Sequence, residues 1–295
     1  MVQKIRIGSR ESKLAVTQAE IVKEMIEKAY PDAEVSIVTM KTTGDKILNR
    51  SLDQIGGKGL FVKELDQALR EGTIDLSVHS LKDMPMELPE DLPLLAFTKR
   101  EDPRDALILK KDIDEVPSGG VIGTSSKRRM IQLKTLYPEC KFHGIRGNVQ
   151  TRMRKLEEEG FDATVLAAAG LRRLGMGTVI GKIFSIEEMI PAAGQGILAV
   201  QRRAGEYEEL REILNDPDSE VMAKAERAFV RTLDGGCTSP IAAFAQIEGE
   251  KVRLKGLYYR ESDEQYFVEE YCEKKELAKE AGEILAKRMK EQYGE

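Results

Sequence analysis

The sequence predicts an α/β protein with two α/β domains around a cleft and a smaller C-terminal α+β domain. Three observations lead to this fold class. Strand-like and helix-like segments alternate through the N-terminal part in a βαβαβ order, which is typical of a layered fold with a largely parallel sheet. A second series of this kind begins near Lys99. After residue 215 the pattern changes to a helix, three alternating apolar segments and a final helix.

The first domain begins with a strand, because apolar residues alternate over Lys4–Gly8. Ser12 is a suitable N-cap for the helix that follows and that carries its apolar residues on one side. A second strand is expected over Glu34–Met40. The polar, glycine-containing stretch Thr42–Lys58 predicts a long loop that closes over a ligand. A helix over 61–71 and a strand over 75–79 complete the series.

The second domain is expected to contain four strands and three helices. The strands are predicted at Asp105–Leu109, Gly120–Gly123, Lys141–Ile145 and Thr164–Ala167, and the helices at Ser126–Leu136, Asn148–Glu159 and Ala168–Leu174. The segment PAAGQGILAVQRR then returns the chain to the first domain as a strand. We therefore expect a first domain of residues 1–98 plus about 195–214, a second, basic domain of residues 99–194, and a C-terminal domain of residues 215–295.

Composition excludes several classes of protein. Of 295 residues 41% are hydrophobic and 33% charged, which is typical of a globular protein with a sizeable core. The formal charge of -5 and the low aromatic content of 5% disfavour a general nucleic-acid binder. Three widely spaced cysteines and two histidines predict neither a disulfide framework nor a metal site. With no apolar signal core or membrane-length segment, we expect a cytoplasmic protein.

Positive charge is concentrated in the second domain. Residues 121–156 contain nine basic residues and one acidic residue, Glu139. Arg128 and Arg129 lie inside a predicted helix after a strand, and Arg146 ends the next strand. Ligands of open α/β sheets bind beyond the carboxyl ends of the strands, where helix N-termini attract anions and arginine forks bind carboxylates. These three arginines therefore predict an acidic ligand or, equally, a solvated basic surface.

Two further residues have chemistry that the pattern alone leaves open. Asp83, in HSLKDMP, follows a predicted strand, where a carboxylate beside Lys82 can move protons or stabilise a cation; ordinary turn chemistry accounts for it as well. Cys237, in DGGCTSP, lies in a sharp connection where a thiol can act as a nucleophile. Cys140 and Cys272 are expected to be small buried hydrophobic residues.

Other familiar sites are not predicted. His79 and His143 are expected to be structural residues rather than catalytic bases. The GGKG sequence at 56–59 does not have the spacing of a phosphate-binding P-loop, and no GxGxxG fingerprint joins the first strand to its helix.

Ten motifs in collinear order resemble the porphobilinogen deaminase (hydroxymethylbilane synthase) family over nearly the whole chain. They are IGSRESKLAVTQA, TTGD, GGKGLFVKELDQAL, HSLKDMP, REDPRDALI, GTSSKRR, IRGNVQTRMRKL, AAAGLRRLG, PAAGQGILAV and DGGCTSPIAA. Lys127, Thr238 and Ser239 depart from the residues usual in that family, which affects only fine substrate geometry.

The resemblance implies a fold and an activity. The first two domains would have the two-lobed fold of periplasmic binding proteins. The enzyme would be a transferase that joins four porphobilinogen molecules head to tail, releases ammonia at each addition, and releases hydroxymethylbilane with water. The chain would grow on a dipyrromethane cofactor made from two porphobilinogen units. By the DGGC motif, Cys237 would hold this cofactor through a thioether.

The resemblance also implies the site residues. Asp83 would be catalytic. The cofactor would contact Lys82, Asp83, Thr124, Ser126, Arg128, Arg129 and Arg146. The substrate would contact Arg10, Ser12, Lys58, Arg152 and Arg173. Because every porphobilinogen unit carries an acetate and a propionate, a basic domain would offset charge that collects during elongation. One carboxylate would stabilise the substrate cation that remains when ammonia departs, and would transfer the protons of the reaction.

Alternative functions have different requirements. A small-anion binding protein with the same two-lobed fold needs neither the loop cysteine nor a third domain. A nucleic-acid-binding protein could use the basic residues 121–156, but the overall negative charge of the chain disfavours this function. Release of ammonia from porphobilinogen separates the enzyme from both. The partners expected are porphobilinogen alone, with no nucleic acid, no membrane and no resident metal, for a protein that acts as a monomer.

Overall fold

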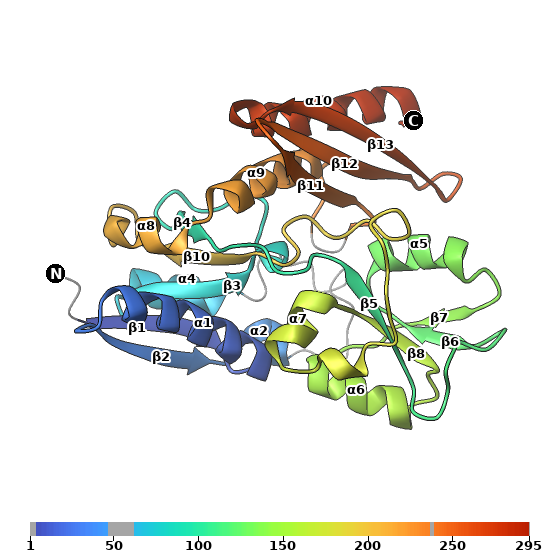
Figure 1. Cartoon of the computed structure of the whole chain (residues 1–295), viewed down its shortest axis with the longest axis horizontal. Helices are drawn as coiled ribbons and strands as arrows, with labels where there is room; N and C mark the ends of the chain where they lie inside the picture. Colours follow the sequence, from blue (N-terminus) through green and yellow to red (C-terminus); the bar gives the residue numbers. More distant parts are fainter. Residues whose placement is uncertain (1–3, 47–61, 237–238, 295) are drawn as a thin grey trace. The chain divides into compact units, whose positions relative to one another are not determined.

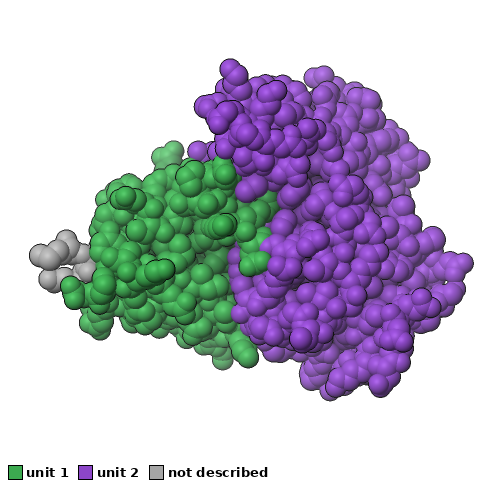
Figure 2. Space-filling view, viewed as in Figure 1, with its two compact units in different colours: residues 1–101, 197–220 green, residues 102–196, 221–295 purple. Residues whose placement is uncertain are grey.

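A computed structural model describes residues 4–46, 62–236 and 239–294 (Figure 1). The chain forms two compact units (Figure 2). Unit 1 contains residues 1–101 and 197–220, and unit 2 contains residues 102–196 and 221–295. The predicted three-domain division, with bounds at 98, 194 and 214, stays a prediction.

Unit 1 is built on a five-stranded sheet in the order β2-β1-β3-β10-β4. The strands are β1 (Lys4–Arg10), β2 (Glu34–Met40), β3 (Leu76–Ser80), β4 (Leu94–Phe97) and β10 (Leu198–Arg202). β1 is parallel to both β2 and β3, as the strands of βαβ units are. β10 does return to this sheet as predicted, but it is antiparallel to β3 and β4. The sheet is therefore mixed, because no crossover helix connects β10 to its neighbours.

Helices cover both faces of this sheet. α1 (Lys13–Ala29) buries Ala19, Val22 and Ile26 against Ile5 and Ile7, and α8 (Arg211–Leu214) lies in the same core. α4 (Lys63–Arg70) packs on the other face through Leu65 and Leu69. A Cβ on Gly8 would lie 2.8 Å from Leu65 Cδ2 and 2.3 Å from Ile74 Cδ1, so glycine is required where this layer meets β1. The predicted loop 42–58 begins with a helical turn, α2 (Thr43–Lys46), and its residues 47–58 lie outside the described residues.

Unit 2 contains a second five-stranded sheet, in the order β7-β6-β8-β5-β9. Its strands are β5 (Asp105–Leu109), β6 (Val121–Gly123), β7 (Lys141–His143), β8 (Ala163–Ala167) and β9 (Lys182–Ile183). Its helices are α5 (Lys127–Leu136), α6 (Val149–Glu158) and α7 (Ala168–Arg173). β6 is parallel to β7 and β8, whereas β5 is antiparallel to β8 and β9. In each of the two sheets four of the five strands therefore run in the same direction and one strand, β10 or β5, is reversed, so the prediction of a largely parallel sheet is confirmed.

The C-terminal part of unit 2 is an α+β layer. β11 (Ala242–Glu248), β12 (Lys251–Arg260) and β13 (Gln265–Lys274) form an antiparallel sheet. α9 (Pro217–Thr232) spans the change of unit at residue 220, and α10 (Ala278–Tyr293) ends the chain. A Cβ on Gly282 of α10 would meet Ala225 O at 2.2 Å, so the two helices are in very close contact. The expected fold class, two α/β parts and a smaller C-terminal α+β part, is confirmed.

Short helices of one turn complete the described chain. They are η1 (Leu81–Asp83), η2 (Gly177–Val179), η3 (Glu208–Leu210) and η4 (Lys275–Leu277).

Candidate functional site

The carboxyl ends of β6 and β7 and the first turns of α5 and α6 meet at one edge of the unit 2 sheet. Thr124 follows β6, and its N–H donates to His143 O of the neighbouring strand at 2.8 Å. Ser126 N–H donates to Thr124 Oγ1 at 3.2 Å, and Ser126 Oγ caps α5 by accepting from Arg129 N–H at 3.4 Å. The TSS sequence thus ends a strand and begins a helix, which brings the N-terminus of α5 to the edge where ligands of such sheets bind.

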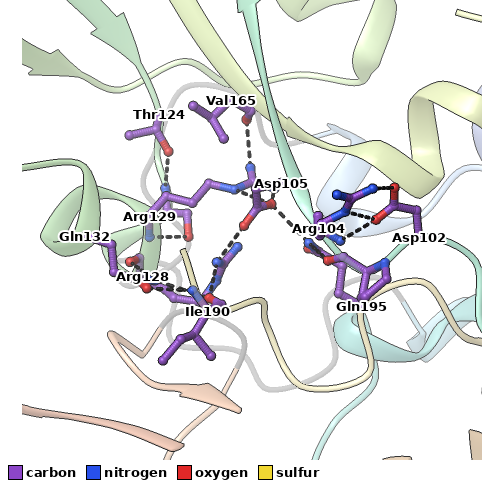
Figure 3. A network of polar contacts seen from close by, with 12 residues as sticks. Asp102, Arg104, Asp105, Thr124, Arg128, Arg129, Gln132, Val165, Ile190 and Gln195 are labelled. Carbon is purple, nitrogen blue, oxygen red and sulfur yellow. Dashed lines mark hydrogen bonds and ion pairs between the residues drawn. The ribbon is translucent and has the colours of Figure 1, made fainter. Parts of the chain in front are cut away.

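Two arginines of α5 converge on one buried carboxylate (Figure 3). Arg128 Nη1 donates to Asp105 Oδ2 at 2.7 Å and to Ile190 O at 2.8 Å. Arg129 donates to Asp105 Oδ1 from Nε at 3.1 Å and from Nη2 at 2.7 Å. Its Nη1 donates to Val165 O at 2.8 Å. The exposed fractions of Arg128, Arg129 and Asp105 are 4%, 6% and 0%, so both charges lie inside the protein rather than on a solvated surface.

The charge of Asp105 is stabilised by these neighbours. Burial by itself would raise the pKa of the Asp105 carboxyl, but the charges and hydrogen bonds of Arg128 and Arg129 outweigh that effect. The pKa of Asp105 therefore lies well below its ordinary range, and the carboxylate is ionised at neutral pH.

Three further arginines belong to unit 2. Arg146 follows β7, and its Nη1 is buried with no hydrogen-bond partner in the described protein. Arg152, on α6, donates from Nε to Gly147 O at 2.9 Å. Arg173, at the end of α7, donates from Nη2 to Gly196 O at 2.6 Å. An unpartnered buried guanidinium nitrogen has a large desolvation cost, which an incoming carboxylate would remove.

Unit 1 has its own candidate residues, at the carboxyl ends of the adjacent strands β1 and β3. Arg10 is the last residue of β1, and Ser12 caps α1 by accepting from Ala15 N–H at 3.3 Å. Lys82 and Asp83 lie in the turn Leu81–Asp83 that follows β3. Asp83 is exposed whereas Leu81 is buried, so the turn presents its carboxylate to solvent from an anchored backbone.

Some predicted site residues lie outside the described residues. They are Lys58 and Cys237, together with Thr238. Ser239 is described, and its Oγ accepts from Gly236 N–H at 2.9 Å. The structure thus groups Thr124, Ser126, Arg128, Arg129 and Arg146 in unit 2 and Arg10, Ser12, Lys82 and Asp83 in unit 1.

Asp105 and Gln195 are polar residues of this site that the sequence patterns did not indicate. Gln195 is fully buried, and its Nε2 donates to Asp105 Oδ1 at 3.0 Å and to Pro103 O at 2.6 Å. Both residues fall within motifs of the resemblance, REDPRDALI and PAAGQGILAV. The available signal was a carboxylate at the start of an apolar strand for Asp105, and a polar residue in an apolar, glycine-containing motif for Gln195.

The histidines and free cysteines are placed as follows. His79 is buried and lies 2.9 Å from Ser77 Oγ through Nε2, which confirms a structural, hydrogen-bonded residue. His143 is exposed. Cys140 is half-buried, and Cys272 is exposed on β13, so the expectation of a buried Cys272 is wrong. Cys272 lies at an exposed position of an alternating strand, where its short side chain meets solvent.

Within the ranges that the structure describes, no group of three or more acidic, histidine or cysteine side chains is arranged to hold a metal ion. Over the same ranges, none of the helices combines the length and the apolar character that crossing a membrane requires.

Unit 2 is an α/β fold with buried arginines near the carboxyl ends of its parallel strands, a set of donors that suits acidic ligands. Two family models match the sequence. Residues 5–211 match the porphobilinogen deaminase dipyrromethane cofactor binding domain, and residues 221–291 match the porphobilinogen deaminase C-terminal domain. The chain belongs to the porphobilinogen deaminase family, whose members are transferases, and it contains the cofactor-binding domain of that family.

Similar proteins include the porphobilinogen deaminase of Ruminiclostridium josui, 51% identical over 98% of both chains. That of Acetivibrio thermocellus is 54% identical over 86% of this chain and 87% of its own. Among solved structures, the periplasmic aliphatic sulphonate binding protein SsuA from Escherichia coli is 13% identical, with a TM-score of 0.42 over 79% of this chain and 71% of its own. The methionine binding protein MetQ is 13% identical, with a TM-score of 0.44 over 71% and 85%.

The residues of unit 2 fit a cofactor that carries carboxylates. Arg146 Nη1 is buried without a partner, and Nε and Nη2 of Arg128 make no hydrogen bond within the described chain. Both arginines follow strands at the same sheet edge, next to the N-termini of α5 and α6. This donor set suits acetate and propionate groups.

Proposed function

We propose that this chain condenses four porphobilinogen molecules head to tail and releases hydroxymethylbilane. Growth starts on a dipyrromethane primer held by Cys237. The observation that carries the proposal is the unpartnered, buried Nη1 of Arg146, in the same unit as the buried Arg128–Asp105 pair, in a chain of this family. An anion site of this kind suits a ligand whose carboxylates increase in number with each addition.

The unit 2 residues bind and orient the acidic groups in this proposal. Arg128, Arg146 and Arg152 supply guanidinium donors, while Thr124 and Ser126 supply hydroxyl groups and the start of α5. Arg129 contributes mainly by holding Asp105. Arg10, Ser12, Lys58 and Arg173 are proposed to contact the incoming porphobilinogen. When bound, dipyrromethane supplies the pyrrole carbon on which the chain is extended.

Asp83 is proposed as the catalytic carboxylate. The C–N bond of porphobilinogen breaks, and the amine leaves as ammonia once it carries a proton. The substrate is left as an azafulvenium cation whose pyrrole N–H an ionised Asp83 stabilises. The new C–C bond forms at the substrate methylene, and the proton released at the coupled ring carbon passes to Asp83. Asp83 is exposed on an anchored turn, which allows contact with substrate.

The finer features of the protein are also proposals. The chain acts as a cytoplasmic monomer with porphobilinogen as its only partner, with neither nucleic acid nor a membrane. The first predicted domain contains the turn with Asp83, the second contains the basic anion site, and the third contains Cys237.

The experiment that tests this function is incubation of the purified protein with porphobilinogen. We expect one ammonia for each porphobilinogen consumed and hydroxymethylbilane as the released product. Reversible binding of porphobilinogen without ammonia would instead support an anion-binding protein and contradict the proposal.

A further inference from the structure

A buried hydrogen-bond network connects the arginines of α5 to the turn at residues 191–196. Asp105, the first residue of β5, accepts from Arg128 and Arg129 and also from Gln195 Nε2 at 3.0 Å. Figure 3 shows the Asp105 carboxylate between these partners. Gln195 belongs to the PAAGQG motif, which has no catalytic or binding role in the proposed function.

The turn itself is held by the C-terminal part of unit 2. Gly194 N–H donates to Glu226 Oε2 at 2.6 Å, and Ala245 N–H donates to Glu226 Oε1 at 2.7 Å. Glu226 is on α9 and is fully buried. Gly194 has a φ of 74°, a left-handed conformation that favours glycine. The turn therefore has a fixed backbone from which Gln195 reaches Asp105.

We propose that Asp105, supported by Gln195, is a positioning residue that sets which guanidinium nitrogens face the acidic ligand. This inference rests on the proposed function, because it concerns the same site. Asp105 and Val165 O occupy all three nitrogens of the Arg129 guanidinium. Arg129 thus holds the site together, because three of its five N–H groups are directed to Asp105 and Val165 O. Arg128 uses only Nη1, so its Nε and Nη2 are available.

Charge explains why a carboxylate is needed at this position. Arg128 and Arg129 are adjacent in sequence, and both are buried, so their like charges repel in a medium of low dielectric constant. Asp105 compensates one of the two positive charges. Its carboxylate accepts from three nitrogens of the two guanidinium groups, which fixes the orientation of both. The pair therefore keeps one net positive charge, which suits a single carboxylate of the ligand.

The test compares Asp105→Asn with Asp162→Asn. Asp162 is a matched control in the same sheet region, because its Oδ2 accepts only a backbone bond, from Val121 N–H at 2.7 Å, and no arginine contacts it in the described structure. Intact mass spectrometry of the purified holoprotein measures the fraction of chains with the covalent cofactor. Steady-state kinetics then separates KM for porphobilinogen from kcat.

We expect Asp105→Asn to raise KM about tenfold, equivalent to about 1.4 kcal/mol, with kcat changed less than about threefold. The loaded fraction should fall as well, whereas Asp162→Asn should match the wild type in both readouts. A purely structural role would lower yield or melting temperature without moving KM. Folded Asp105→Asn with wild-type KM and full loading would overturn the inference.

A second variant decides the matter if Asp105→Asn does not fold. Gln195→Leu removes the amide that donates to Asp105 Oδ1 and to Pro103 O, and we expect a KM increase of about threefold. Unchanged KM and loading in Gln195→Leu would then overturn the inference. Wild-type protein with no covalent group and no ammonia release would contradict the proposed function and this inference with it.

Discussion

Gln18 and Ser80 share a pair of hydrogen bonds between α1 and the end of β3. Gln18 Nε2 donates to Ser80 Oγ at 2.9 Å, and Ser80 Oγ donates to Gln18 Oε1 at 3.2 Å. Gln18 is almost fully buried, at 4% exposed. Ser80 is the residue before the Leu81–Asp83 turn, so this pair fixes the backbone from which Asp83 extends.

Asp83→Asn should lower kcat for hydroxymethylbilane formation by about 100-fold or more while the protein stays folded and loaded. The amide keeps the shape of the side chain but has neither the charge that stabilises the substrate cation nor the ability to accept a proton. Product formation followed by absorbance, with loading followed by mass, measures both. Glu87→Gln, at another exposed acid shortly after the turn, should retain wild-type activity. Near-normal kcat in Asp83→Asn would remove Asp83 from the mechanism.

Arg146→Leu should raise KM for porphobilinogen about tenfold or more, because one charge-assisted hydrogen bond to a ligand carboxylate is lost. Its fold should be little affected, since Arg146 Nη1 has no partner in the described protein. Arg154→Leu is the control. Arg154 is exposed and pairs with Glu158 at 2.7 Å one helical turn away, a contact that contributes about 0.5 kcal/mol or less.

Arg128→Leu should weaken both ligand binding and the fold. Removing Arg128 leaves part of the buried Asp105 charge uncompensated, and such a change costs about 3 kcal/mol. Kinetics and urea unfolding of Arg128→Leu, Arg146→Leu and Arg154→Leu measure the two effects separately. Equal kinetic effects in all three variants would show that total charge, not position at the sheet edge, controls binding.

Intact protein should be heavier than the sequence mass by one dipyrromethane, and peptide mapping should place the group on Cys237. Cys237→Ser should lose the added mass and nearly all tetrapyrrole synthesis. Its melting temperature should also fall, because a ligand bound only to the folded state stabilises that state. Cys140→Ser and the exposed Cys272→Ser are controls that should keep the added mass. An unmodified mass in active wild-type protein contradicts this assignment.

The stability of unit 1 should depend on pH through His79. Burial, and then the charge of Arg10, lower the pKa of His79 from 6.5 to about 4. A group whose pKa is lowered on folding makes its full contribution to the free energy of unfolding at a pH above its pKa in the unfolded state. This contribution, about 3 kcal/mol, is lost as the pH falls from about 6.5 to about 4. His79→Gln should abolish this loss, whereas His143→Gln, at an exposed site, should not.

Asp66 should have the opposite effect to His79 on the pH dependence of stability, over nearly the same pH range. Burial raises the pKa of Asp66 from 3.8 to about 6, so its contribution is largest below about 4 and is lost as the pH rises through 6. His79→Gln should therefore become less stable as the pH rises from 4 to 6. Asp66→Asn should become less stable as the pH falls from 6.5 to 4. Urea unfolding at pH 4.5, 5.5 and 6.5 measures both slopes, and parallel curves for the two variants would contradict the assignment.

Local features of the chain were predictable from its sequence. Ser12 caps α1 as expected, and the helix at Ser126 and the strand at Asp105 begin where the pattern places them. Capping and side-chain periodicity depend on residues within about four positions, so a linear pattern contains them. The direction of β10 and β5 was not predictable in this way, because strand pairing depends on how the chain returns from the other unit.

The sequence by itself determined the family, the order of most strands and helices, with β4 and β9 missed, and the clustering of arginines after two strands. Only the tertiary structure decided what those arginines do. Arg128 and Arg129 lie 23 and 24 positions from Asp105 along the chain, yet their side chains meet in the interior. The tertiary structure also decided that Cys272 is exposed and that His79 is buried. Burial and long-range hydrogen bonds decide which charges compensate one another, and both arise only when distant segments pack together.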